Sequence, residues 1–178
     1  QGLGMGAVSL FGSPAQRAWL SRTRSGNAIA AFAMTEPGSG SDVAATAATA
    51  SRVQGGFVLN GEKTYISNGG IADVYVVFAR TGEAPGARGL SAFLMPADAP
   101  GLEIAGRIEV MAPHPLAHLR LSNVELPEAA LRAHALRPVV HLAQTLHARR
   151  QPCQTMGAML RLIDAGVRRL IVVPLFAQ

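Results

Sequence analysis

The stretch that decides the expected fold is residues 57–66, which reads Phe57-Val58-Leu59-Asn60-Gly61-Glu62-Lys63-Thr64-Tyr65-Ile66. Strand-forming residues stand at both ends of it, and Asn60-Gly61 lies between them. Asparagine and glycine tolerate the positive φ angles that a two-residue turn requires, so this dipeptide is a strong hairpin signal. The stretch therefore predicts two short antiparallel strands, Phe57–Leu59 and Glu62–Ile66, joined by a turn at Asn60-Gly61.

Further short runs with strand-like character lie on both sides of this stretch. They are Ala28–Met34, Val74–Ala79, Leu90–Met95 and His118–Val124. Turn signals separate these runs, among them Pro37-Gly38, Pro85-Gly86 and Pro100-Gly101. Several short strands with regularly spaced turns are typical of an antiparallel β-sandwich or β-barrel. We therefore expect a mainly β fold, with an antiparallel barrel or sandwich over residues 28–132 and helical segments flanking it.

The start of the chain has helical character instead. Ser13 followed by Pro14 is typical of a helix start, with Ser13 as the N-cap and Pro14 at the first helical position. Gly26 is typical of a helix end. We assign residues 1–27 to a helical segment that precedes the β region.

The tail after residue 132 differs from both preceding parts. Its apolar residues have helical rather than strand spacing over 133–150 and 154–165, and a short β-type run follows. Asp164 is its single acidic residue. We therefore treat residues 133–178 as a divergent, mostly helical tail of unknown role.

The composition argues against several classes of function. The chain has 178 residues, of which 49% are hydrophobic, and a formal net charge of +5. Its arginines are scattered, whereas a nucleic-acid-binding protein needs a clustered basic face. The single cysteine, Cys153, excludes an internal disulfide and argues against a structural zinc site. No apolar run reaches the ~20 residues of a membrane span, and no signal-peptide pattern is present, so a cytoplasmic protein is expected.

A second stretch carries the candidate binding chemistry, and it reads Ala33-Met34-Thr35-Glu36-Pro37-Gly38-Ser39-Gly40-Ser41-Asp42. It lacks the patterns of helix-opening phosphate loops. If Gly38 and Gly40 adopt angles closed to other residues, their N–H groups can still converge on one anion. Ser39 and Ser41 add hydroxyl donors. An ordinary surface loop has the same composition, and the residues alone leave both possibilities open.

These two stretches together resemble the acyl-CoA dehydrogenase family. In the loop stretch, residues at the spacing of the family's first signature are Thr35, Glu36, Gly40, Ser41 and Asp42. Residues 60–69 are similar to the family's Asn-Gly-x-Lys-x-Trp-Ile-Ser/Thr-Asn-Gly segment, with Tyr65 in place of the usual tryptophan. The resemblance covers about residues 1–132, where it implies the end of the family's N-terminal helical domain followed by its flavin-binding middle β domain.

The resemblance implies FAD as the cofactor and places five residues around its isoalloxazine ring. Met34 and Thr35 would face the ring. Tyr65, Ile66 and Ser67 would flank it, with a donor of Ser67 near the ring nitrogen N5. A donor there stabilises the charge that grows as the flavin is reduced.

The remaining implied contacts lie toward the phosphate end of the cofactor. Phe32 would line the FAD site, and Gly40 and Ser41 would hold the pyrophosphate. Ser41 is also the candidate contact of the acyl-CoA substrate. No residue of the chain is assigned a catalytic or metal-binding role.

Other polar residues have simpler explanations in the sequence. Glu36 is expected to be a solvated or turn-stabilising carboxylate, Asp42 a turn or capping residue, and Lys63 a surface residue. His114 and His118 have no carboxylate or cysteine near them in the sequence, so we expect no metal site.

The implied function is that of an FAD-dependent oxidoreductase of fatty acid metabolism. The family removes an α-proton and a β-hydride from acyl-CoA thioesters, and its electrons pass to an electron-transfer flavoprotein or a similar acceptor. The family's base is a glutamate in a C-terminal helical domain that the tail does not resemble. We therefore expect a truncated form without the base, and a homo-oligomer for an intact member. The alternatives are an acyl-CoA oxidase or flavin monooxygenase of the same fold, and a non-catalytic β-domain remnant.

Overall fold

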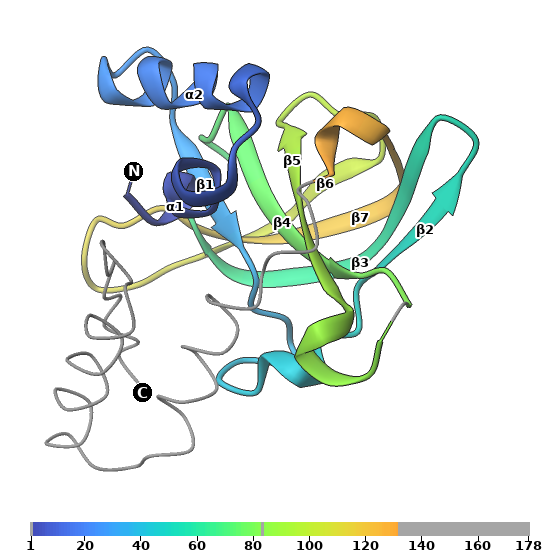
Figure 1. Ribbon diagram of the computed structural model, residues 1–178. Helices are drawn as coiled ribbons and strands as arrows, with labels where there is room; N and C mark the ends of the chain where they lie inside the picture. The colour runs from blue at the N-terminus through green and yellow to red at the C-terminus, as the bar shows by residue number, and fades with distance from the viewer. Residues whose placement is uncertain (1, 83, 132–178) are drawn as a thin grey trace, which may run out of the picture.

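The computed structural model describes residues 2–82 and 84–131, and the predicted tail lies outside this range. This part of the chain forms two α-helices, one 7-stranded sheet and short 3-10 turns. Figure 1 shows that the sheet is curled. The elements are α1 (Gly2–Phe11), α2 (Pro14–Arg24), β1 (Ala30–Ala33), β2 (Thr49–Val53), β3 (Gly56–Ser67), β4 (Val74–Arg80), β5 (Leu90–Pro96), β6 (Leu102–Ile108) and β7 (Leu116–Pro127). Short 3-10 turns are η1 (Val43–Ala45), η2 (Gly86–Gly89) and η3 (Glu128–Ala130). The predicted mainly β fold is confirmed.

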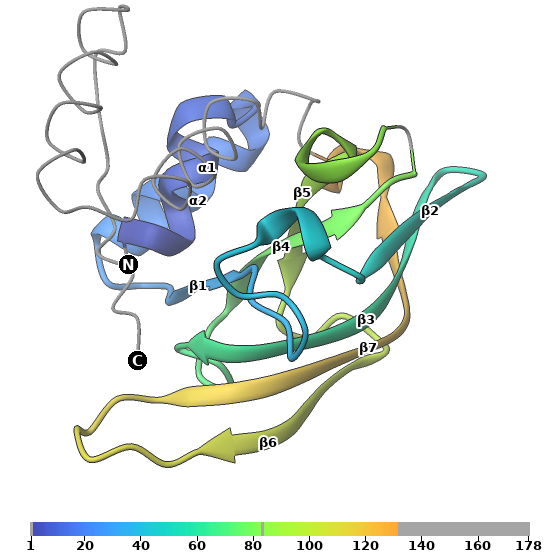
Figure 2. The ribbon, with the colours of Figure 1, turned by 90° about the horizontal axis from the view of Figure 1, so that it is seen from below.

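The sheet has the strand order β1-β4-β2-β3-β7-β6, and β5 pairs with β4. Figure 2 shows the long strands β3 and β7 side by side, with β6 at the edge and the helices at the far side. Most neighbours are antiparallel, but β1 runs parallel to β4 with Ala30 opposite Val74. The sequence pattern did not indicate this parallel pair, because side-chain alternation is the same in both strand directions.

The predicted turn at Asn60-Gly61 is wrong. β3 passes straight through these residues, and the hairpin between β2 and β3 instead turns at Gln54-Gly55, where Gly55 has a φ of 86°. The pairing of β3 with β7 shifts register between Leu59 and Gly61, which marks a bulge. Gly61 has a φ of 143°, and a Cβ there would lie 2.7 Å from that of Ala48. The dipeptide thus signals a positive φ angle, which a bulge uses as well as a turn.

The predicted start of α2 is confirmed. The Ser13 hydroxyl accepts a hydrogen bond from the Gln16 amide, and the Gln16 side chain accepts one from the Ser13 amide, which together form a capping box. The Gln16 side chain also donates to the carbonyl of Ala129, 2.9 Å away, and so attaches the helix to the end of the β region. α1 packs closely on β1, because a Cβ at Gly4 would lie 2.8 Å from that of Ala30.

Buried side chains lie on both faces of the sheet. Along β4, Val74, Val76 and Phe78 belong to the cluster under α1, and Tyr75 and Val77 alternate into the cluster inside the curl. A strand buried on both faces has a continuous apolar sequence, which explains why β4 was predicted correctly. By contrast, β2 and β6 were not predicted, because most of their residues are exposed. No helix in the described part of the chain is long and apolar enough to span a membrane.

Candidate functional site

The loop between β1 and β2, residues 34–48, is held by hydrogen bonds within itself. Glu36 and Ser39 exchange two backbone hydrogen bonds of 2.8 and 3.1 Å around Pro37-Gly38. The Ser39 hydroxyl donates to the Asp42 carbonyl at 2.7 Å. The Asp42 carboxylate accepts from the Ala44 amide at 3.1 Å and so caps η1, as predicted for this residue. The loop therefore has a defined shape of its own.

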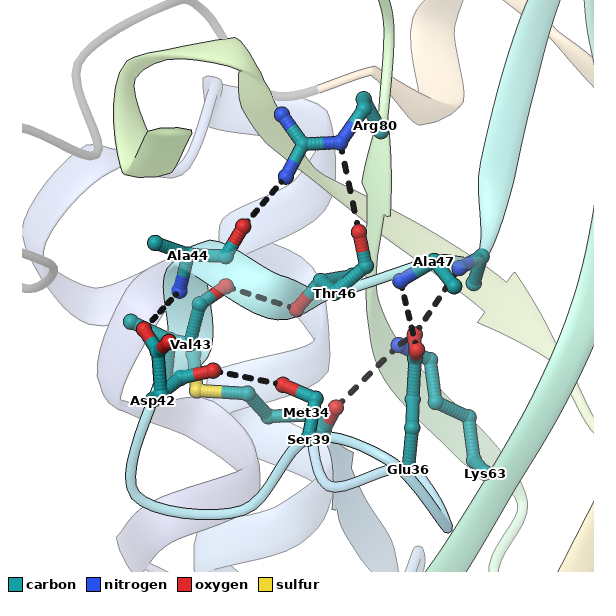
Figure 3. A network of polar contacts seen from close by, with 11 residues as sticks. Met34, Glu36, Ser39, Asp42, Val43, Ala44, Thr46, Ala47, Lys63 and Arg80 are labelled. Carbon is teal, nitrogen blue, oxygen red and sulfur yellow. Dashed lines mark hydrogen bonds and ion pairs between the residues drawn. The ribbon is translucent and has the colours of Figure 1, made fainter. Parts of the chain in front are cut away.

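A buried ion pair attaches this loop to β3 (Figure 3). Lys63 Nζ lies 2.7 Å from Glu36 Oε1, and the two side chains are 0% and 5% exposed. Lys63 also donates to the carbonyl of Met34 at 3.2 Å. The Glu36 carboxylate accepts from the amides of Ala47 at 2.6 Å and Ala48 at 3.1 Å. Both charges are thus compensated by polar partners, as buried charges require.

This geometry corrects two expectations. Lys63 is not a surface residue and Glu36 is not solvated, although Glu36 does stabilise its loop as the other expectation held. Burial lowers the pKa of Lys63, and the hydrogen bond and negative charge of Glu36 act in the opposite direction. Sequence reasoning missed the pair because its members are 27 residues apart and neither sequence position shows burial.

The tip of the loop is open to solvent. Gly40 and Ser41 are exposed, and a Cβ added at Gly38 or Gly40 would meet nothing within 4 Å. Neither glycine has a positive φ, so the special backbone angles expected for a phosphate-binding nest are absent. Small residues still leave room here, and a ligand can approach the backbone and the Ser41 hydroxyl closely.

The end of β3 forms the second part of the candidate site. The Thr64 amide donates to the Thr35 carbonyl at 2.9 Å, which brings the two signature segments together. The register of β3 shifts between Lys63 and Ile66, and within this bulge Tyr65 has a φ of 54°. Such an angle is uncommon for a bulky residue, and strain of this kind concentrates at functional sites. Tyr65 itself is 62% exposed to solvent.

The bulge also decides where the next two residues lie. The Ile66 side chain is buried in the core, 1% exposed, so only the backbone of this predicted ring contact is available to a ligand. Ser67 is half-buried, and its hydroxyl lies 2.9 Å from Nε2 of His114. Sequence reasoning missed the contact with His114, which comes from the connection between β6 and β7 and is 47 residues away.

The three predicted contacts at the β1 end are half-buried. Phe32 and Met34 pack against the core cluster under α1, with the Phe32 ring centroid 4.8 Å from that of Phe78. Thr35 is joined to β3 through its carbonyl. Hydrogen bonds thus connect Thr35, which follows β1, with β3. Asp42 lies on the far side of the loop from Lys63 (Figure 3).

A further side chain holds the second half of the loop. Arg80, at the end of β4, donates to the carbonyls of Ala44 at 2.8 Å and Thr46 at 3.2 Å (Figure 3). It also donates to the carbonyl of Gly86 at 3.0 Å. Within residues 2–82 and 84–131, no three His, Cys, Asp or Glu side chains gather as a metal site would require.

Comparison with known proteins identifies the family. Residues 31–124 match the family described as "Acyl-CoA dehydrogenase, middle domain". An acyl-CoA dehydrogenase of Bacillus subtilis is 36% identical over 132 residues, which cover 72% of this chain and 35% of that protein. The chain belongs to the acyl-CoA dehydrogenase family, and it spans about a third of this relative's length.

Two solved structures show the same fold. A glutaryl-CoA dehydrogenase from Mycobacterium smegmatis, solved in complex with FADH2, has a TM-score of 0.71 and 34% identity, covering 79% of this chain and 36% of that one. A structure described as the electron transferring flavoprotein of Acidaminococcus fermentans has a TM-score of 0.74 and 30% identity, covering 79% and 38%. FAD is therefore the cofactor expected for this family.

The residues of the site are compatible with FAD. The tip of the loop has open space beside two glycines, and the Tyr65 ring is exposed. The hydroxyl of buried Thr64 has no hydrogen-bond partner among the described residues, as occurs where a polar ligand completes a site. The loop contains two carboxylates. Asp42, which follows Ser41 in the first signature, accepts a hydrogen bond from a backbone amide. The negative charge of Glu36 is compensated by Lys63, which reduces the repulsion between Glu36 and a pyrophosphate.

Proposed function

We propose that this chain supplies the FAD-binding middle domain of an enzyme that oxidises the α,β bond of acyl-CoA thioesters. The observation that carries the proposal is the junction of the two signature segments. Thr64 and Thr35 join them by a backbone hydrogen bond, and three residues of these segments with predicted flavin contacts are exposed, namely Gly40, Ser41 and Tyr65. Bound FAD would supply the hydride acceptor that this oxidation needs.

Each part of the site has a distinct proposed task. Gly40 and Ser41 would bind the pyrophosphate through backbone N–H groups and a hydroxyl, with Ser41 also reaching the substrate. Met34 and Thr35 would place the ring, and Tyr65 would exclude water from it with a flat apolar face, smaller than that of the family's tryptophan. Ser67, with its hydroxyl already bonded to His114, would present a donor to the ring edge.

Neither carboxylate of the loop is suited to remove the α-proton. Both oxygens of Glu36 accept hydrogen bonds from Lys63 and from backbone amides. Asp42 caps η1. A general base must come within hydrogen-bond reach of its proton in a state that can accept it. We therefore propose that the base is none of the loop residues, and that this chain alone is a poor dehydrogenase.

The substrates and partners of the whole enzyme follow from the family as proposals. They are an acyl-CoA thioester, an electron-transfer flavoprotein or similar acceptor, and a homo-oligomeric assembly. The cytoplasmic location expected from the sequence also stays a prediction.

FAD binding is the first test. The purified chain is mixed with FAD, unbound cofactor is removed, and the visible spectrum and the dissociation constant are measured. We expect flavin absorbance bands in the wild type and weaker binding in Gly40→Leu, where the added side chain fills open space without a backbone clash. Ala97→Leu, on an exposed turn after β5, is the matched control. A colourless wild-type protein would support the non-catalytic remnant instead.

Turnover is the second test. The FAD-loaded chain is assayed with an artificial electron acceptor and acyl-CoA substrates of several chain lengths. Because a positioned base contributes ~10²–10⁴-fold, we expect rates far below the general enzyme median of ~10 per second. Turnover near that median would mean that a carboxylate of this chain is the base, and replacing Glu36, Asp42 and Asp164 in turn by the matching amide would then identify it.

A further inference from the structure

We propose that Glu36 and Lys63 are positioning residues, which together hold the loop of residues 37–46 in its cofactor-binding shape before the cofactor arrives. The inference rests on the proposed function for its consequence, but its physical basis is a set of contacts in the protein itself. We call Glu36, Lys63 and the groups they bond, which are the carbonyl of Met34 and the amides of Ala47 and Ala48, the loop clamp (Figure 3).

The loop clamp joins the start of the loop to its end. Glu36 stands at the start, and its carboxylate accepts from Ala47 and Ala48, which are 11 and 12 residues further along. Bringing the ends of a flexible loop together costs conformational entropy. Because the carboxylate closes this loop within the protein, a ligand at the tip does not have to supply that ordering when it binds.

Lys63 fixes the closed loop to the sheet. Its side chain comes from β3, lies 2.7 Å from Glu36 and also donates to the Met34 carbonyl. The next residue of β3, Thr64, binds the Thr35 carbonyl through its amide. Three successive residues directly after β1 are thus tied to two successive residues of β3. The loop therefore has one position relative to the exposed ring of Tyr65, which follows directly on the same strand.

An ion pair suits this task better than an apolar pair of the same size. Apolar side chains could fill the space, but they could not accept hydrogen bonds from two amides or donate to a carbonyl. A carboxylate without its counter-charge would be costly to keep buried beside the amides, and its negative charge would repel the pyrophosphate proposed to bind at the tip. Lys63 compensates the charge of Glu36 at 2.7 Å, so the carboxylate can accept hydrogen bonds from the amides while its own charge is offset.

The second half of the loop has separate supports. Arg80 binds the carbonyls of Ala44 and Thr46, and Asp42 caps η1. Removing the loop clamp should therefore release the amides of Ala47 and Ala48, while η1 stays in place. This regional difference separates a positioning role from general unfolding, because unfolding would release both halves together.

The test compares hydrogen exchange and FAD affinity in the full chain. The variants are Lys63→Met, which leaves a buried carboxylate, and the double variant Glu36→Gln/Lys63→Met, which has no buried charge and keeps the shapes of both side chains. Arg52→Met is the control, because Arg52 forms an ion pair with Glu128 at 2.9 Å whose side chains are 56% and 55% exposed. Circular dichroism establishes that each variant is folded.

In the cofactor-free protein, we expect the amides of Ala47 and Ala48 to exchange at least about tenfold faster in both clamp variants, as local opening becomes easier. FAD affinity should fall by roughly tenfold or more in the same proteins, with neither change in Arg52→Met. Unchanged exchange and affinity in a folded double variant would overturn the proposal, as would exchange that rises equally across η1. A wild-type chain that does not bind FAD would refute the proposed function, and the exchange experiment would still decide whether the clamp orders the loop.

Discussion

The β1–β2 loop and the β6–β7 hairpin both carry ion pairs, but the two regions differ in how water reaches those pairs. In the loop, Lys63 and Glu36 are 0% and 5% exposed. On the hairpin, Arg120 contacts Glu103 at 3.0 Å and Glu62 at 3.5 Å, and these side chains are about half exposed. Buried charges that lose a partner leave an uncompensated charge, whereas exposed ones exchange the partner for water. An ion pair therefore helps to fix the conformation of the loop, where it is buried. On the hairpin, where it is exposed, an ion pair contributes little to the conformation.

The pKa directions express the same difference. The charges of Glu103 and Glu62 raise the pKa of Arg120, because almost nothing opposes them at an exposed site. Burial lowers the pKa of Lys63 despite the adjacent Glu36. In the loop, the loss of hydration outweighs the attraction, so the pair depends on its complete set of hydrogen bonds.

The largest effect is expected from breaking the buried pair. Lys63→Met should lower the free energy of unfolding by about 3–5 kcal/mol, because the Glu36 carboxylate stays buried without its counter-charge. Urea denaturation monitored by circular dichroism measures this value. A loss below ~1 kcal/mol would show that water hydrates the Glu36 carboxylate in the variant, so that the buried pair contributes no more to stability than an exposed pair.

An intermediate effect is expected where β3 and β7 pack closely. A Cβ at Gly56 would collide with the carbonyl oxygen of Leu126 on β7, so Gly56→Ala should destabilise the chain by about 1–3 kcal/mol. Gly38→Ala, in the open loop, is the control, and it should be neutral or stabilising by about 0.4–1 kcal/mol. Thermal unfolding of the two variants distinguishes these outcomes, and equal losses would contradict the difference in packing.

A smaller effect is expected at Tyr75, whose hydroxyl accepts a hydrogen bond from the Gly70 amide at 2.9 Å. Tyr75→Phe should cost about 1 kcal/mol, because the amide loses its partner. Burial raises the pKa of Tyr75 above 10.0, more than the Gly70 hydrogen bond and Arg107 lower it. Since folding favours the neutral phenol, this contribution is complete below pH 10 and is lost as the pH rises through the raised pKa.

Stability measured from pH 8 to 11 in the wild type and in Tyr75→Phe tests this linkage. The wild type should lose stability faster at the alkaline end, so the difference between the proteins should shrink. A difference that stays constant over the range would mean that the phenol titrates alike in the folded and unfolded chains.

The smallest effect is expected on the hairpin. Arg120→Gln should leave the denaturation midpoint unchanged at physiological salt, because exposed pairs are screened and gain little. The measurement is repeated at low salt, where screening is weakest and the exposed ion pairs of Arg120 contribute most to stability. A loss comparable to that of Lys63→Met would show that burial is not what separates the two regions.

Predictions from the sequence succeeded where the signal is local. Ser13 and Pro14, which predicted the start of α2, are adjacent, and β4 is apolar from Val74 to Ala79, so neighbouring residues contain the necessary information. Prediction failed where one local signal serves two structures. Asn60-Gly61 supports the positive φ of a bulge as well as that of a turn, and only the pairing of β3 with β7 decides between them.

The same distinction between local signals and distant contacts applies to the candidate site. By itself, the sequence determined that a glycine- and serine-rich loop and a second signature segment exist at the spacing of the acyl-CoA dehydrogenase family, because residue identity and order are enough for that. Only the tertiary structure decided that Glu36 and Lys63 meet, that Tyr65 is exposed and Ile66 is buried, and that His114 reaches Ser67. Those outcomes depend on strand register and burial, which arise when residues 27 to 47 positions apart are brought into contact by the curled sheet.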